Sequence, residues 1–248
     1  MDSETNYCKN CGRITHSAYC ANCGQRSSVH EVTMRETFED LADNLFSLSA
    51  PIVITIKSLI TDPGKLLREY LGGKRKKYYK PISFFILTTA VYLFLRWSIG
   101  FDIRESISMG ESSVQQVDAN KINQASYFFF QNINSLAFFL VFTMSLALKI
   151  FFYSKYSLAE YVAVAFYLNG VYSLLATINT FFMKFINPEV QYLAILVMVV
   201  YFVYAMLRFF RKKPWLVLVK SIVAFFLAYV GYFILAFGFS YIIVLLRN

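Results

Sequence analysis

The sequence predicts an all-α polytopic membrane protein with about five transmembrane helices and a small cysteine-rich module in front of them. Hydrophobic residues make up 57% of the 248 residues, with 26 Phe and 18 Tyr, and this composition excludes an ordinary soluble domain. Several apolar stretches reach or approach the ~20 residues that cross a bilayer as a helix. All four cysteines precede these stretches.

Five apolar stretches are the predicted spans: 81–99, 136–153, 161–182, 192–210 and 216–246. The last stretch is longer than a bilayer requires, so it must tilt, extend beyond the bilayer, or bend at Gly231 or Gly238. Dividing it into two short helices would give six spans, and this alternative stays open at the sequence level.

The basic residues predict the orientation. Fourteen Lys and Arg lie in 65–80, 149–155 and 208–220, on one side of the five predicted spans. The other side holds five basic residues, which are Arg96, Arg104, Lys121, Lys184 and Arg247. The positive-inside rule therefore predicts a cytoplasmic N-terminus and an outer C-terminus. Residues 1–30 contain no apolar run of the signal-peptide type, so the first span is expected to be an uncleaved anchor.

Four cysteines form two CxxCG motifs near the N-terminus: Cys8, Cys11, Cys20 and Cys23. Two such turns supply four thiolates, which is the tetrahedral ligand set of structural zinc. The predicted module is a zinc ribbon over residues 1–30 with zinc as its cofactor. A closed four-thiolate shell leaves no position for a substrate, so a catalytic metal is not expected. Two disulfides, a redox dithiol pair and an iron site are the alternatives, and a cytoplasmic location disfavours the disulfides.

Residues 31–80 are expected to connect the ribbon to the membrane domain, 81–248. Apolar residues recur every three or four positions over 41–59, which predicts an amphipathic, interfacial helix, broken near Pro51. A second helix is predicted with Asp62 as its N-cap, Pro63 as its first residue and Gly72-Gly73 at its end.

A basic segment leads into the first span. It contains Lys74, Arg75, Lys76, Lys77 and Lys80, together with two tyrosines, Tyr78 and Tyr79. One interpretation is purely topological, with the tyrosines at headgroup level. The interpretation with a specific role is that the five cations bind anionic lipid headgroups, at ~1 kcal/mol per basic residue. Contact with RNA is a third interpretation, and the nearly neutral charge of the ribbon disfavours nucleic acid as a partner.

The order of motifs resembles a bacterial family of uncharacterised multi-span membrane proteins with an N-terminal zinc ribbon. The motifs that carry the resemblance are the two CxxCG turns, Thr61-Asp62-Pro63-Gly64-Lys65, Arg68-Glu69-Tyr70, Gly73-Lys74-Arg75-Lys76-Lys77-Tyr78, and Tyr156-Ser157-Leu158-Ala159-Glu160-Tyr161. The resemblance implies a multi-pass protein of the bacterial inner membrane and supports the architecture. It implies no activity.

No enzyme is expected, because the sequence holds no catalytic triad pattern, no HExxH, no phosphate-binding loop and no paired carboxylates within a span. Three function classes follow from the composition. The first is a membrane adaptor or assembly factor whose ribbon docks a protein partner. The others are an oligomeric channel or transporter and a membrane-permeabilising effector. The adaptor is favoured, because few polar residues are available to line a pore.

Overall fold

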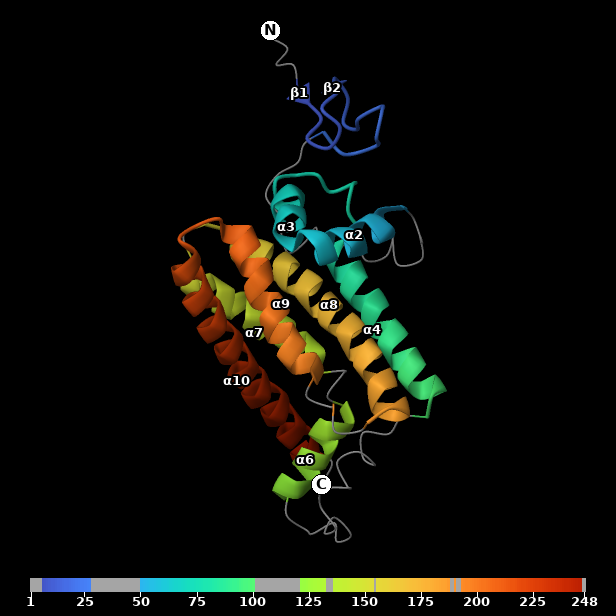
Figure 1. Ribbon diagram of the computed structural model, residues 1–248, viewed down its shortest axis with the longest axis vertical. Coiled ribbons are helices and arrows are strands. Elements are labelled where there is room, and N and C mark those ends of the chain that lie inside the picture. Colours follow the sequence, from blue (N-terminus) through green and yellow to red (C-terminus); the bar gives the residue numbers. More distant parts are fainter. Residues whose placement is uncertain are drawn as a thin grey trace.

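The protein is described by a computed structural model, which places residues 6–27, 50–100, 121–132, 136–153, 155–187, 190 and 193–246. A helical bundle forms most of the molecule, and the cysteine module, residues 6–27, lies beyond one end of it (Figure 1). The elements in chain order are β1 (Asn6–Tyr7), β2 (Ile14–Thr15), α2 (Ala50–Thr61), α3 (Pro63–Leu71), α4 (Pro81–Ser98), α6 (Lys121–Asn132), α7 (Ala137–Phe151), α8 (Leu158–Phe185), α9 (Leu193–Phe210) and α10 (Pro214–Leu246).

Four helices of the described chain are long and apolar enough to cross a membrane: α4, α8, α9 and α10. They correspond to the first, third, fourth and fifth predicted spans, with boundaries that shift by a few residues. The prediction of a helical protein with several helices able to span a membrane is therefore confirmed, with four such helices in the described residues.

The second predicted span, 136–153, is a shorter helix. Its counterpart α7 has 15 residues, which rise by about 22 Å, less than the ~30 Å hydrocarbon core of a bilayer. The helix α6 precedes it, and Leu136 N–H donates to the Asn132 carbonyl across the junction at 3.0 Å. Both α6 and α7 pack against α10. Two helices therefore lie along α10, where the sequence predicts the single span 136–153.

The last predicted span is one continuous helix. The 33 residues of α10 run without interruption through Gly231 and Gly238, with a length of about 50 Å. Neither glycine bends the helix, and neither has a positive φ. The helix runs beside α9 and extends along α6 at the far end of the bundle (Figure 1). The expectation of extra length is confirmed, and of the alternatives for the last stretch the continuous helix is the one observed, rather than two short helices.

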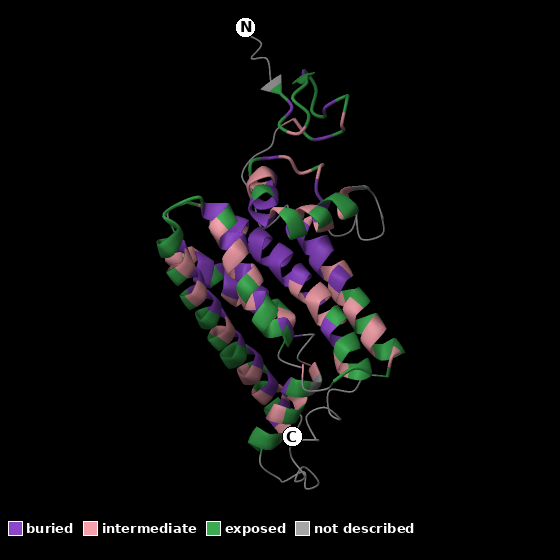
Figure 2. Cartoon of the chain, viewed as in Figure 1, coloured by how far each residue is buried: buried purple, intermediate pink, exposed green. Residues whose placement is uncertain are grey.

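The helix α8 lies at the centre of the bundle, where it packs against α4, α7 and α9. Two-thirds of its most apolar window is buried, a larger share than in the other long helices (Figure 2). Close packing with α4 depends on Gly170, where a Cβ would lie 2.5 Å from the Phe84 ring. The Thr89 and Ser173 hydroxyls bond between the same two helices at 3.1 Å. Small and polar residues thus join α4 to α8, as is common in membranes.

The helices α2 and α3 lie across one end of the bundle. Leu59, Leu66, Leu67 and Tyr70 are buried in the same hydrophobic core as residues of α8 and α9. The predicted caps of α3 are confirmed: the Asp62 carboxylate accepts from Lys65 N–H at 3.1 Å, Pro63 opens the helix, and Gly72 ends it. The N-terminal half of the predicted amphipathic helix, 41–49, lies outside the described residues.

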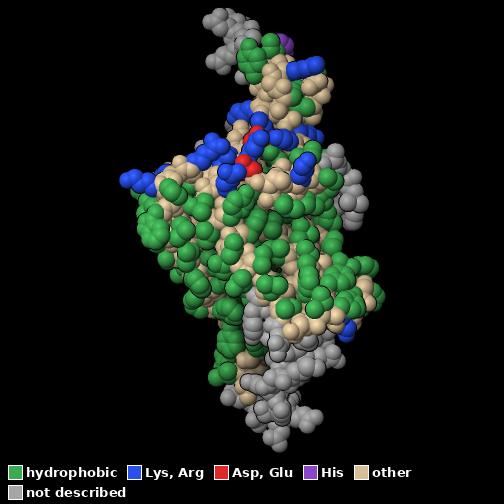
Figure 3. Space-filling view, in the orientation of Figure 1, with side chains coloured by type: hydrophobic (Ala, Val, Ile, Leu, Met, Phe, Trp, Pro, Cys, Tyr) green, Lys and Arg blue, Asp and Glu red, His purple; other side chains and the backbone are tan. Residues whose placement is uncertain are grey.

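Basic side chains gather at the end of the bundle that carries α2, α3 and the cysteine module (Figure 3). The N-termini of α4, α8 and α10 and the C-termini of α7 and α9 meet at this end. All fourteen cations on the predicted cytoplasmic side belong to these elements and their connections. We call this end the basic end.

Candidate metal centre

Two equivalent turns build the cysteine module. In the first, Cys8 N–H donates to the Arg13 carbonyl and Gly12 N–H donates to the Cys8 carbonyl, both at 2.8 Å. Twelve residues later, Cys20 N–H donates to the Gln25 carbonyl and Gly24 N–H to the Cys20 carbonyl, also at 2.8 Å. Gly12 and Gly24 have φ values of +76° and +68°, a left-handed conformation that side chains disfavour. The glycine after each CxxC motif therefore has a backbone role.

The four sulfur atoms converge. All four Sγ atoms lie within 4.8 Å of one another, with 3.5 Å between Cys8 and Cys23 and 3.6 Å between Cys11 and Cys20. Thiolates about 2.3 Å from a tetrahedral ion lie about 3.8 Å apart, so these distances fit one ion at the centre. The cysteines are free thiols, and their separations are well above the ~2.05 Å of a disulfide. The predicted ligands are thus brought together and could hold a metal ion.

The surroundings of two thiols differ. The backbone hydrogen bond from Arg13, with one from the Asn22 side chain, lowers the pKa of Cys11 to about 6. Burial raises the pKa of Cys23 to about 11. A metal ion binds the deprotonated form of each ligand. The lowered pKa therefore favours the thiolate form of Cys11. At Cys23, where the pKa is raised, a metal ion would have to displace the proton when it binds.

Gln25 connects the cysteine module to the basic segment. Its Nε2 donates to the Gly73 carbonyl at 2.8 Å, and its Oε1 accepts from Lys76 N–H at 3.2 Å. The side chain is 4% exposed, so both ends of the amide are satisfied in a buried contact. Sequence reasoning did not find this contact. The available signal was that Gln25 follows the second CxxCG, where Arg13 follows the first.

Glu69 organises the loop that Gln25 contacts. Its carboxylate accepts from Lys77 Nζ at 2.6 Å, from the Tyr78 hydroxyl at 2.7 Å and from Lys74 Nζ at 3.1 Å. Burial raises the pKa of Glu69, but the hydrogen bonds from Lys77, Tyr78 and Lys74 outweigh it and lower the pKa to about 2. The charged form of Glu69 therefore holds residues 74–78 against α3.

We expect Glu69→Gln to loosen this loop. Hydrogen bonds to charged groups each contribute about 1.5–3 kcal/mol, and the amide would keep at most part of one of them. Because the folded pKa lies below the ordinary value of 4.5, the stabilisation is present above pH 4.5 and is lost as the pH falls toward 2. Hydrogen exchange of the backbone amides of residues 72–80 at pH 6 and pH 3 measures how firmly the loop is held. Wild type should lose part of its protection at pH 3, where Glu69 is still largely ionised, and Glu69→Gln should already lack it at pH 6. Equal protection in both proteins at pH 6 would contradict the assignment.

The five basic residues that were predicted to bind lipid headgroups all lie on this loop, and several of them contact the protein itself. Lys74 and Lys77 form ion pairs with Glu69, and Lys76 contributes its backbone N–H to Gln25. Arg75 and Lys80 also have interactions within the protein.

Tyr78 and Tyr79, expected at headgroup level, are instead 3% and 5% exposed. Tyr79 N–H donates to the Thr55 hydroxyl at 2.8 Å, and the Tyr167 hydroxyl donates to the Tyr79 carbonyl at 2.5 Å. The two tyrosines thus face the interior of the protein, because the loop folds into it. Lipid binding by the five cations stays a prediction.

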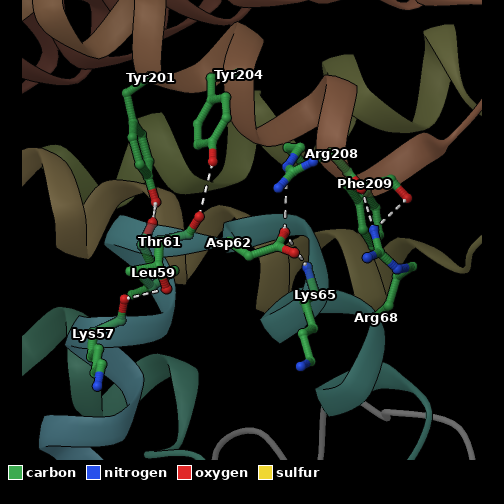
Figure 4. A network of polar contacts seen from close by, with 10 residues as sticks. All are labelled: Lys57, Leu59, Thr61, Asp62, Lys65, Arg68, Tyr201, Tyr204, Arg208 and Phe209. Atoms are coloured by element: carbon green, nitrogen blue, oxygen red, sulfur yellow. Dashed lines mark hydrogen bonds and ion pairs between the residues drawn. The ribbon is translucent and has the colours of Figure 1, made fainter.

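Side chains of α3 and α9 satisfy the helix ends that meet at the basic end (Figure 4). The Tyr201 and Tyr204 hydroxyls donate to the Leu59 and Thr61 carbonyls, at 3.1 and 3.0 Å. In return, the Arg68 guanidinium donates to the Arg208 and Phe209 carbonyls at the end of α9. The last carbonyls of a helix have no partner within the helix, so these bonds satisfy both α2 and α9. The arrangement holds the unit formed by α2, α3 and the loop 72–80 firmly on the bundle.

One of the recognised motifs forms the turn between α7 and α8. Ser157 and Glu160 make a capping box: Glu160 N–H donates to Ser157 Oγ at 3.2 Å, and Ser157 N–H donates to the Glu160 carboxylate at 2.7 Å. The Tyr161 hydroxyl donates to the Phe152 carbonyl at 2.7 Å. These roles are structural.

The comparisons with known proteins concern the connecting region and not the cysteines. A family model described as a protein of unknown function (DUF3667) matches residues 52–93, which comprise most of α2, all of α3, the basic loop and the first part of α4. No curated protein and no solved structure matches the chain. Over this segment, where Asp62, Arg68 and Glu69 make the contacts described above, the chain is similar to an uncharacterised family.

Proposed function

We propose that this chain is a non-enzymatic membrane adaptor whose cysteine module binds one structural zinc ion and docks a cytoplasmic protein partner. The observation that carries the proposal is the Gln25 contact: the buried amide bonds to both Gly73 and Lys76 and fixes the module to the membrane-bound unit. A module that was only a flexible extension of the chain would have no use for a buried contact with the membrane domain. A docking module gains from it, because a fixed orientation lowers the entropy cost of binding.

Zinc is the metal that we propose. Four soft thiolates in tetrahedral positions suit zinc or iron–sulfur centres. The module has two-residue strands and little apolar surface around the sulfurs, so zinc, which needs no redox environment, is the better fit. The closed ligand shell gives the ion a structural role.

The surface of the module suits a protein partner. Tyr7 and Ile14 face each other across the two short strands and are 63% and 52% exposed. Tyr19, which occupies in the second turn the place of Tyr7 in the first, is 57% exposed. Exposed aromatic residues are enriched at protein interfaces. The first turn thus presents its apolar residues, while the second turn carries Gln25 and contacts the membrane domain.

We further propose five crossings of the bacterial inner membrane, with the cysteine module in the cytoplasm and the C-terminus outside. In this arrangement four crossings are made by α4, α8, α9 and α10. The remaining crossing, second in chain order, is made by α6 and α7 together, beside α10. The basic end supports the orientation, because the fourteen cations lie on elements that meet there.

Cysteine labelling in intact cells tests this orientation. A cysteine at Asp2 or at Lys212 should be labelled only from the cytoplasm, and a cysteine at Ser112 or Asn248 only from outside. Wild type, which carries only the native cysteines, measures the background labelling from each side. Labelling of Asn248 from the cytoplasm would exclude five crossings.

Affinity purification of the full chain in mild detergent tests the adaptor. We expect a stoichiometric partner with wild type and its loss with Cys8→Ser plus Cys23→Ser. Tyr7→Ala should weaken retention about tenfold or more, as expected for a buried aromatic anchor. Tyr153→Ala is the matched control, since Tyr153 is also exposed, at 71%, but lies on the bundle. Equal retention by all four proteins would show that the module does not dock the partner.

A further inference from the structure

A second group of cations at the basic end lies apart from the loop 72–80. Arg68 comes from α3, Lys155 from the turn between α7 and α8, and Arg211 and Lys212 from the turn between α9 and α10. Arg68 donates to the Phe209 carbonyl at 3.4 Å. These four residues, the second cation group, come from one helix and two turns that are distant from one another in sequence.

Aromatic rings lie beneath this group. Lys155 Nζ is 5.3 Å from the centre of the Tyr156 ring and 5.8 Å from that of Phe210. Tyr156 also stacks on Phe209, with 5.0 Å between ring centres. The rings fix the position of Lys155 without neutralising its charge.

The second cation group has little acidic compensation. Three acidic residues are described at the basic end, and two of them are engaged elsewhere: Glu69 with Lys74 and Lys77, and Glu160 with the backbone of Ser157. The third, Asp62, lies 3.7 Å from Arg208. Within the described part of the chain, no carboxylate lies within ion-pair distance of Arg68, Lys155, Arg211 or Lys212.

The cations also repel one another. Burial and then Arg211 lower the pKa of Arg68, despite the opposing effect of Asp62. Burial, Lys212 and Arg68 lower the pKa of Lys155. Positive charges held close together without counter-charges attract an anion, and the N-terminus of the 33-residue helix α10 adds to the attraction.

The depth of the group in the membrane is indicated by its neighbours. Trp215, at the start of α10, is 74% exposed, and Tyr153, at the end of α7, is 71% exposed. Trp and Tyr concentrate where the headgroups meet the hydrocarbon core. Exposed apolar side chains, such as Ile150 at 57%, continue along α7 away from the basic end. A ligand at this place would have its anionic part beside the cations and an apolar part along the helices.

We propose that Arg68, Lys155, Arg211 and Lys212 form a binding site for the phosphate of an anionic phospholipid. An arginine fork suits two phosphate oxygens, and lysines supply mobile point charges around it. Basic sites between transmembrane helices on the cytoplasmic side are typical of acidic headgroup binding. This site is separate from the five cations of the loop 72–80, two of which share an ion pair with Glu69.

Native mass spectrometry of the full chain in neutral detergent tests the site, with phosphatidylglycerol, phosphatidylcholine and inorganic phosphate as probes. The test variant is Lys155→Gln plus Lys212→Gln. The matched control, Lys57→Gln plus Lys65→Gln, removes the same charge from exposed positions of α2 and α3. At the usual contribution of a basic residue near the membrane, the test variant should bind phosphatidylglycerol about 30-fold more weakly. The control should stay close to wild type, and Lys155→Arg plus Lys212→Arg should restore binding.

Three results would overturn the proposal. An equal loss in test and control variants would mean that the overall surface charge attracts the lipid. Equal binding of phosphatidylglycerol and phosphatidylcholine by wild type would show that charge is not recognised. Equal binding of inorganic phosphate and phosphatidylglycerol would make the ligand a free anion. Lys212→Gln alone, a change in an exposed turn, repeats the test if the double variant loses its fold.

Discussion

Replacing Cys8 and Cys23 with serine is expected to remove one zinc ion per chain and to unfold residues 6–27, while the helical bundle keeps its fold. The module has two strands of two residues each, and few of its residues are buried, chiefly Cys8, Thr15, Cys20 and Gln25. A core of this size cannot offset the entropy of ordering the chain. Structural zinc contributes about 10–16 kcal/mol to folding in comparable peptides, so the metal decides whether this module folds.

Elemental analysis of purified protein measures the metal, and limited proteolysis measures the fold of the module. A chelator should make wild type as protease-sensitive as the variant and should not affect the variant further. Iron in place of zinc, or no metal in wild type, would contradict the assignment. Cleavage within α2 or α3 in the variant would mean that the metal also stabilises the bundle.

Gly64→Ala is expected to have the largest effect among single substitutions in the bundle. A Cβ at Gly64 would lie 2.2 Å from the Arg208 carbonyl carbon and 2.5 Å from Phe209 N, which are backbone atoms that cannot rotate away. The start of α3 would have to move from the end of α9, and the Arg68 hydrogen bonds across this contact would be lost. Overpacking usually costs about 1–3 kcal/mol, and a clash with backbone should reach or exceed the upper value.

Thermal unfolding in detergent measures this effect, and Gly238→Ala is the matched control. Gly238 is also in a helix, but a Cβ there meets no atom within 4 Å. It should stabilise α10 slightly, because alanine favours a helix by up to about 1 kcal/mol over glycine. A Gly64→Ala protein as stable as wild type would mean that α3 and α9 do not approach each other this closely.

The features that the sequence by itself determined are local. The two CxxCG motifs bring their own thiolates together, because the cysteines and the left-handed glycine lie within one turn. The caps of α3 were predictable because Asp62, Pro63 and Gly72 act on their own helix. The four long apolar helices follow from the number of consecutive apolar residues, and the basic residues between them can be read directly from the sequence.

The tertiary structure alone decided which distant groups meet. Gln25 bonds to Gly73, 48 residues away, and Arg68 bonds to the end of α9, 140 residues away. A glutamine amide or an arginine can satisfy its donors equally well with water, so the sequence around it does not specify a distant partner. The same reason explains two further unexpected results at the basic end. Tyr78 and Tyr79 are buried because Glu69 and Tyr167 offer them partners inside the protein, and the uncompensated cations converge at the turns beside α3.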